Sequence, residues 1–191
     1  MLNRQDQEGL ESAIEVSYNA RQHGNHPFGA VLADAKGKIV VKSENTVNTG
    51  RDGVDVTNHA EMNLVRDAQK AIGGSLANYT LYSSCEPCAM CSGAIYWAGV
   101  PRVVYALSDE ELNKEFITGT SKSPLEDIDK YQQKYSCRKV FEMQQHEVEV
   151  AGPALIEKAR KPHIGFWTKW GKPNPIEKVE EEKLFLQKLS Q

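Results

Sequence analysis

The sequence predicts a layered α/β fold, in which helices cover both faces of one sheet. The chain has 191 residues, of which 40% are apolar, and this suits a single α/β domain with a sizeable core. Helical and strand-like patterns follow one another in the order helix, hairpin, helix, strand, helix, strand. Such an alternation is typical of domains built from stacked layers.

The first elements are a helix and a hairpin. A helix is expected over residues 6–22, where residues that can share one face recur at helical spacing: Leu10, Ala13, Ile14, Ser17 and Tyr18. Gly24 and Pro27 end it. Strand-like runs follow at 28–33 and 38–42, and the Lys-Gly turn between them predicts a hairpin.

The next four elements alternate between helix and strand. We expect a helix over 59–72 that stops at Gly73-Gly74, and a strand over 79–83. Pro87 suits the first turn of a helix over 87–98, because proline there lacks only an amide that would be unpaired anyway. A further strand is expected over 102–107.

The second half of the chain has weaker patterns. Residues 108–145 are polar and resist assignment, apart from a short helical stretch near 124–135. A strand is expected over 146–150, and a closing helix starts within 153–160. We expect one domain over residues 1–170, followed by a charged, helical C-terminal extension over 171–191.

Charge and composition limit the possible partners. The formal net charge is −3 and the pI is about 6.0, which disfavours a nucleic-acid surface without excluding a local basic patch. No apolar run reaches the roughly 20 residues of a membrane-spanning helix, and the N-terminus does not look like a signal peptide. The expected compartment is the cytoplasm, where closely spaced cysteines are better explained as metal ligands than as disulfides.

Three residues have the pattern of a catalytic zinc site. Cys88 and Cys91 are three apart at a helix start, so both sulfurs project from one face, and the positive end of the helix dipole favours thiolates. His59, at the start of another helix, supplies a third ligand. Three protein ligands with one open position are typical of catalytic zinc, whereas a structural site normally has four.

Glu61 lies two residues beyond His59 and is the candidate catalytic residue. Its carboxylate would take a proton from the attacking water and pass it to the ring nitrogen and the leaving ammonia. The combination H-x-E followed by P-C-x-x-C is the signature of zinc nucleobase deaminases. The alternative is a structural or degenerate site without catalysis, which the intact Glu61 disfavours.

At these residues the chain resembles the cytidine deaminase-like superfamily, in particular its guanine deaminase and nucleoside deaminase branch. The resemblance covers residues 8–107, with a weaker similarity to 170, and includes the segments 26–31, 84–88 and 93–98. It implies a three-layer α/β/α sandwich with a central mixed sheet, a bound Zn²⁺, a small-molecule nucleobase or nucleoside as substrate, and a homodimer.

The same resemblance suggests substrate contacts. Asn45 matches an asparagine that hydrogen-bonds the base, and Phe28 matches a wall of the pocket. The backbone amides of Ala60 and Cys88 match groups that hold the substrate. Trp97 is a candidate for lining the pocket and is equally well explained as a core residue.

The substrate is left open by the sequence. A guanine-type purine is the leading interpretation, although the stretch 115–119 lacks the acid that guanine deaminases carry after a phenylalanine. Residues 145–150 and Trp167 look like fungal cytosine deaminase, yet those enzymes carry glycine where this chain has Ala60. The alternatives are cytosine or another small aminated ring such as a pterin or triazine, tRNA adenosine, and a non-catalytic zinc-stabilised scaffold.

The patterns around the remaining histidines and cysteines indicate no chemical role. We expect His26 in a surface loop, and His146 and His163 as ordinary surface or packing residues. Cys85 is expected to be a buried thiol, and Cys137 has no partner in the sequence.

Overall fold

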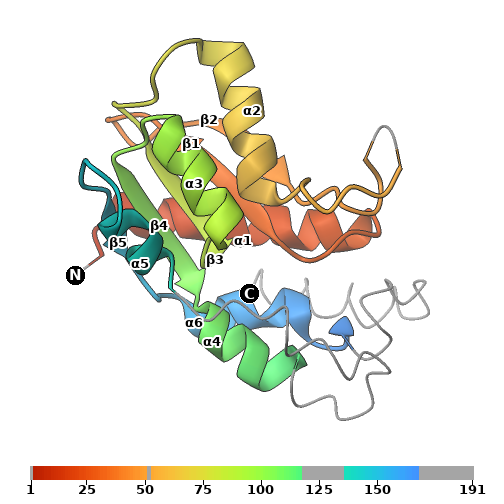
Figure 1. Cartoon of the computed structure of the whole chain (residues 1–191). Coiled ribbons are helices and arrows are strands. Elements are labelled where there is room, and N and C mark those ends of the chain that lie inside the picture. Colours follow the sequence, from red (N-terminus) through yellow and green to blue (C-terminus); the bar gives the residue numbers. More distant parts are fainter. Residues whose placement is uncertain (1, 51–52, 118–135, 168–191) are drawn as a thin grey trace.

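The protein folds around a five-stranded sheet with the strand order β2-β1-β3-β4-β5 (Figure 1). The computed structural model describes residues 2–50, 53–117 and 136–167. The strands are β1 (Gly29–Ala33), β2 (Ile39–Glu44), β3 (Thr80–Cys85), β4 (Arg102–Leu107) and β5 (Glu149–Ala151). The α-helices are α1 (Arg4–Gln22), α2 (Ala60–Ile72), α3 (Ala89–Trp97), α4 (Asp109–Leu112), α5 (Cys137–Glu142) and α6 (Ile156–Arg160).

The sheet is mixed, as the resemblance implies. β1 pairs antiparallel with both β2 and β3, while β3, β4 and β5 run parallel. The expected hairpin joins β1 and β2, and Asp34 Oδ1 accepts hydrogen bonds from the amides of Lys36 and Lys38 in its turn. Because α3 connects the parallel strands β3 and β4, its first turn lies beyond the carboxyl end of β3.

Alternate residues of the strands build two separate cores. Leu32, Leu81 and Val103 face the core beneath α2, α3 and α5, whereas Val31, Tyr82 and Val104 face the core beneath α1 and α6. The strand period of two residues places successive side chains on opposite faces. Figure 1 shows α2 and α3 on one side of the sheet and α1 on the other, which confirms the three-layer α/β/α arrangement.

Two glycines allow α1 to approach the sheet closely. A Cβ atom at Gly9 would lie 2.6 Å from the ring of Tyr82 on β3, and one at Gly29 would lie 2.5 Å from the backbone oxygen of Ala13. Both separations are far shorter than van der Waals contact. Alanine at either position would therefore push α1 away from the strands.

The starts of β5, α3 and α6 differ from those expected, for reasons that the structure shows. β5 begins at Glu149 and not at His146, because His146 is held outside the sheet, stacked on Tyr96 with ring centroids 4.1 Å apart. α3 begins at Ala89, with Cys88 extended as its N-cap, so Pro87 lies before the helix. α6 begins at Ile156, since Leu155 has a positive φ of 51° that is not helical.

Residues 108–117 and 136–145 supply α4, α5 and a π-helical turn at Asn113–Ile117 between them in the sequence. The helical stretch expected near 124–135, the boundary at residue 170 and the extension 171–191 lie outside the described residues and stay predictions. Among the described helices, none is long and apolar enough to cross a membrane.

A buried ion pair joins α1 to β4. Asp6 is 1% exposed, and its two carboxylate oxygens accept hydrogen bonds from Arg102 at 2.6 and 3.1 Å. The backbone amide of Asn3 and the hydroxyl of Tyr82 also donate to this carboxylate. Burial raises the pKa of Asp6, but these donors outweigh burial and the net pKa is lowered.

We expect Asp6→Asn to lower the free energy of unfolding by about 3 kcal/mol at pH 7, because it leaves Arg102 without its buried counter-charge. The Asp6 pKa is lower in the folded state, so its contribution is present above the unfolded value of about 3.9 and is lost as the pH falls through the folded value. The deficit of the variant should therefore shrink at pH 3, as measured by urea unfolding.

Glu149→Gln is the matched control, since Glu149 contacts the same arginine at 2.9 Å but is 64% exposed. Its cost should stay below about 1 kcal/mol. Equal losses for the two variants would contradict the assignment of stability to the buried pair.

Candidate metal and catalytic centre

Three side chains meet at one end of the sheet with their ligand atoms close together. His59 Nδ1 lies 3.6 Å from the sulfur of Cys88 and 3.6 Å from the sulfur of Cys91. The two sulfurs are 3.5 Å apart. The three residues predicted as metal ligands from sequence thus form one cluster.

The local structure of two helix starts produces this cluster. His59 is the N-cap of α2 and Cys88 is the N-cap of α3, and both have extended backbone angles. Neither cap residue uses its side chain to bond the helix amides. The first turn of each helix therefore keeps its positive dipole end directed at the cluster, which favours thiolate at Cys88 and Cys91.

The spacing of the ligand atoms fits a tetrahedral zinc ion. With Zn–S bonds of about 2.3 Å and Zn–N bonds of about 2.0 Å, neighbouring sulfurs lie about 3.8 Å apart and a sulfur and a nitrogen about 3.6 Å apart. The observed separations of 3.5 and 3.6 Å agree within a few tenths of an ångström. Two thiolates and one imidazole also match the donor chemistry that zinc prefers.

The cysteines are electrostatically prepared to bind a metal. The pKa of Cys88 is lowered to about 4, mainly because the Cys91 thiol donates a hydrogen bond to it, with His59 adding to the effect. The pKa of Cys91 is raised by its neighbour Cys88 and by burial. One sulfur is thus ready as a thiolate, and the second must lose its proton when a cation binds.

Glu61 is buried beside this cluster, on the first turn of α2, and is 6% exposed. Its Oε1 accepts a hydrogen bond of 2.7 Å from the hydroxyl of Ser83 on β3. Its Oε2 lies 3.5 Å from the sulfur of Cys91. Burial raises the pKa of this carboxyl, which moves it toward the range where a group can both accept and donate a proton near neutral pH.

Glu86 holds the segment that carries the cysteines. Its Oε1 accepts hydrogen bonds from the Ser136 hydroxyl at 2.5 Å and the Cys137 amide at 2.9 Å, and its Oε2 accepts one from the Asp109 amide at 3.3 Å. This carboxylate therefore joins the metal loop to the starts of α4 and α5. The sequence indicated no partner for Cys137. In the structure its buried thiol lies beside the Glu86 carboxylate.

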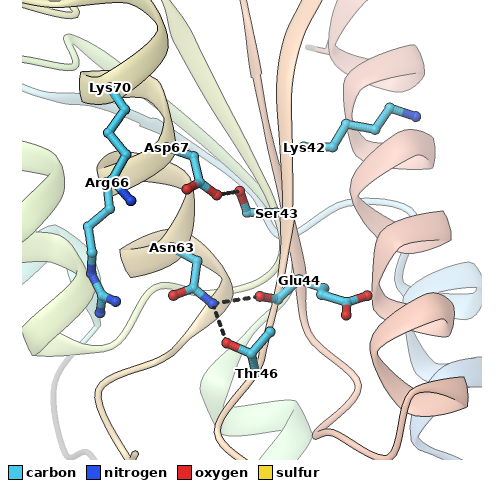
Figure 2. Close-up of a pocket in the computed structure, with 8 residues that line it drawn as sticks. All are labelled: Lys42, Ser43, Glu44, Thr46, Asn63, Arg66, Asp67 and Lys70. Atoms are coloured by element: carbon cyan, nitrogen blue, oxygen red, sulfur yellow. Dashed lines mark hydrogen bonds between the residues drawn. The ribbon is translucent and has the colours of Figure 1, made fainter. Parts of the chain in front are cut away.

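α2 is tied to β2 by two polar side chains one helical turn apart. Asn63 Nδ2 donates to the backbone oxygen of Glu44 and to the hydroxyl of Thr46, both at 2.9 Å, and the Ser43 hydroxyl donates to Asp67. Figure 2 shows Asn63 and Asp67 projecting from α2 onto β2, while Lys42 points away from them. These bonds fix the rotation of α2 and hence the direction of Glu61.

Three of the four residues predicted to contact substrate lie at the ends of elements: Phe28 directly precedes β1, Asn45 directly follows β2 and Ala60 begins α2. Asn45 is 1% exposed and follows β2, and its amide donates to the backbone oxygen of Phe28. Ala60 is the first residue of α2 and is fully buried. Their contacts with a substrate stay predictions.

Trp97 is a correction. Its side chain is 86% exposed, so it is not a core residue of this chain. It ends α3, and a helix of nine residues separates it from Cys88 by about 13 Å. The core alternative for Trp97 is therefore wrong, and its role in lining a pocket stays a prediction.

Two histidines also lie deeper than expected. His26 is half-buried, not a surface-loop residue, and its ring stacks on Trp167 with centroids 5.6 Å apart. His163 is fully buried among aromatic rings. Ser83, Glu86 and His163 are the residues that sequence reasoning missed, because each acts through partners distant in the sequence. Cys85 is a buried thiol, as expected.

The chain is similar to known deaminases over most of its length. The family described as the cytidine and deoxycytidylate deaminase zinc-binding region matches residues 3–107. A probable cytosine deaminase of Schizosaccharomyces pombe is 38% identical over 166 residues, covering 87% of this chain and 94% of that protein. A tRNA-specific adenosine deaminase of Haemophilus influenzae is 30% identical over 175 residues, covering 91% and 90%.

The X-ray structure of guanine deaminase from Bacillus subtilis is similar in fold, with a TM-score of 0.52 and 34% identity, covering 65% of this chain and 81% of that one. The matched region contains the complete His59, Cys88 and Cys91 cluster and Glu61. The chain therefore belongs to the family of the cytidine and deoxycytidylate deaminase zinc-binding region, and it is a zinc-dependent enzyme that hydrolyses the C–N bond of an amino group.

Proposed function

We propose that this chain deaminates a free nucleobase or nucleoside, with a guanine-type purine as the leading substrate. The observation that carries the proposal is the buried carboxylate of Glu61, held by Ser83 on one oxygen and facing Cys91 with the other. In the overall reaction, water replaces the ring amino group, which leaves as ammonia.

His59, Cys88 and Cys91 would hold the zinc ion. When bound, zinc is a Lewis acid that activates water at neutral pH. Glu61 takes a proton from the attacking water on Oε2, the oxygen that Ser83 leaves free. It then delivers that proton to the ring nitrogen, and a second proton transfer through the same carboxyl assists the departure of ammonia. Ser83 keeps the carboxylate in one orientation throughout.

The guanine-type substrate is supported by the motifs around the metal ligands and by the 34% identity to Bacillus subtilis guanine deaminase. Cytosine is a second candidate, because the alignment with the Schizosaccharomyces pombe protein runs through 94% of its length and so extends beyond the metal region. The similarity to a tRNA-specific adenosine deaminase makes tRNA adenosine a third substrate to be tested.

We expect the zinc-loaded protein to release ammonia from one member of a panel containing guanine, guanosine, cytosine, cytidine, adenine, a pterin, an aminotriazine and an anticodon stem-loop of tRNA. Glu61→Gln should keep zinc and the melting temperature but lose at least about 10³-fold in kcat, since the residue serves two proton transfers. The assay is enzymatic ammonia detection, with zinc content measured in parallel.

Glu110→Gln, at an exposed position on α4, is the matched control and should retain full turnover. Full turnover by Glu61→Gln would remove Glu61 from the mechanism. Silence of the wild type across the whole panel, with zinc bound, would favour the non-catalytic scaffold.

We expect Ser83→Ala to lower kcat about tenfold, because a hydrogen bond to a charged group is lost. Ser83 lowers the pKa of Glu61, so its removal raises that pKa. Glu61 must be deprotonated to accept the first proton, and the acid limb of the kcat–pH profile should therefore shift to higher pH.

Ser84→Ala is the control for this shift. Ser84 is as buried as Ser83 and lies on the same strand, but its hydroxyl accepts from the amide of Gly29 at 3.0 Å. Its replacement should reduce stability and leave the acid limb in place. An unshifted limb in Ser83→Ala would show that the bond to Glu61 has no role in proton transfer.

The homodimer implied by the resemblance is also proposed here, and the outer face of α3 supports it. α3 contains no charged residue, and its exposed face carries Met90, Gly93 and Trp97 at helical spacing. Exposed tryptophan and methionine beside small residues are typical of protein interfaces.

Trp97→Glu should convert a dimer into a monomer in light scattering coupled to size-exclusion chromatography, because it replaces the largest exposed apolar side chain of that face with a charge. Val40→Glu, which changes another exposed apolar residue on β2 that is 41% exposed, should leave the mass unchanged. A monomeric wild type at micromolar concentration would contradict the proposed dimer.

A further inference from the structure

His163 lies in an aromatic cluster built from three distant parts of the chain. We call it the 163 cluster, and it consists of His26, Phe28, Phe116, His163, Phe166 and Trp167. The His163 ring centroid is 5.3 Å from that of Phe28, 5.6 Å from that of Phe116 and 6.1 Å from that of Trp167. The side chain has no exposed surface.

The hydrogen bonding of His163 fixes its tautomer. The indole Nε1–H of Trp167 donates to His163 Nδ1 at 3.2 Å, and an indole nitrogen can only donate. Nδ1 is therefore unprotonated. Burial, reinforced by the positive charge of Arg21, lowers the pKa of His163 to about 3. The ring is neutral at physiological pH, and its single proton is on Nε2.

This Nε2–H donor has no acceptor in the described structure. His163 Nε2 is fully buried and lacks a hydrogen-bond partner. Buried donors in native proteins nearly always have one, because an unpaired buried donor costs the full desolvation penalty of the group. A free donor enclosed by aromatic rings is the arrangement expected of a site that awaits an acceptor atom from a ligand.

The 163 cluster adjoins the metal centre through two of its members. Phe28 directly precedes β1, and its backbone oxygen accepts from Asn45. His26 stacks on Trp167, and it is close enough to His59 for the charge of His59 to lower the His26 pKa, after the larger effect of burial. His163 packs on Phe28 and Trp167, so it belongs to the same group of side chains as His26, the cluster member that senses the charge of the ligand His59.

We propose that His163 Nε2–H donates a hydrogen bond to an acceptor atom of the substrate ring, on the edge remote from the carbon that is attacked. This inference rests on the proposed function and makes His163 a specificity-determining residue. The ligand it fits is a neutral planar heterocycle with a carbonyl oxygen on that edge.

Two substitutions of His163 separate the effect of its Nε2–H donor from the effect of its imidazole ring. In His163→Gln the side-chain amide reaches the place of Nε2 and can still donate, whereas in His163→Asn the shorter amide reaches only the place of Nδ1 and keeps an acceptor for Trp167. We expect His163→Asn to raise KM about tenfold with kcat changed less than threefold. His163→Gln should restore KM to within about threefold of the wild type. If packing alone mattered, both variants would lose the ring and fail alike.

The carbonyl oxygen of the substrate that would accept this hydrogen bond can be removed as well. Cytosine is compared with 4-aminopyrimidine, which lacks the ring carbonyl oxygen, and guanine is compared with 2-aminopurine, which lacks it too. The wild type should prefer the carbonyl-bearing member of the pair at least tenfold in KM, and His163→Asn should show less than a threefold preference. This comparison keeps the inference testable even if His163→Asn folds poorly, since a wild type without preference in either pair would overturn it.

Binding without turnover distinguishes the two proposals. Calorimetric titration of cytosine and guanine into zinc-loaded Glu61→Gln, with and without His163→Asn, should show a tenfold loss of affinity caused by the second change. Turnover by the wild type with no effect of His163→Asn would overturn the role of His163 alone. Binding that depends on His163 without ammonia release by the wild type would overturn the proposed function alone, and binding of neither base would overturn both.

Discussion

The structure depends on one geometric constraint, which is that two helices must begin side by side at the same end of the sheet. His59 and Cys88 are both N-cap residues, so the ligand atoms come from the points where extended chain becomes helical. There the backbone amides have no partner within the helix and the dipole favours negative charge. Metal ligands tolerate only about 0.2 Å of error, far less than the roughly 1.5 Å by which one residue advances a helix.

The bonds outside the cluster can be understood as the means of meeting this tolerance. Asn63 and Asp67 tie α2 to β2, and Glu86 ties the cysteine loop to two later helix starts. At the opposite end of β4 from the metal loop, Asp6 fixes α1 against Arg102. Asp6, Glu86 and the Ser43 partner of Asp67 have little exposed surface, and a buried polar group costs free energy if left unpaired. The correct arrangement of helices is therefore also the one that satisfies these groups.

Features encoded by neighbouring residues were predictable from the sequence, and features that depend on distant partners were not. The metal ligands, the hairpin and β4 follow from local spacing, and the structure confirms them. His163 was expected to be ordinary because its neighbours in sequence are basic, whereas its actual neighbours are Phe28 and Trp167. The core alternative for Trp97 failed for the opposite reason, since an apolar residue at helical spacing predicts a buried face even where no described residue covers it.

Chemistry and substrate choice are placed in different parts of this chain. The ligands and Glu61 come from residues 59–91, while the 163 cluster, which we propose to contact the substrate ring, joins residues 26–28 and Phe116 to residues 163–167. The second set can therefore change without disturbing the first. Proteins similar to this chain carry names as different as cytosine, guanine and tRNA adenosine deaminase. Two of these relatives, a probable cytosine deaminase and a tRNA-specific adenosine deaminase, align with 87% and 91% of this chain, so the extent of similarity alone does not identify the ring that is bound.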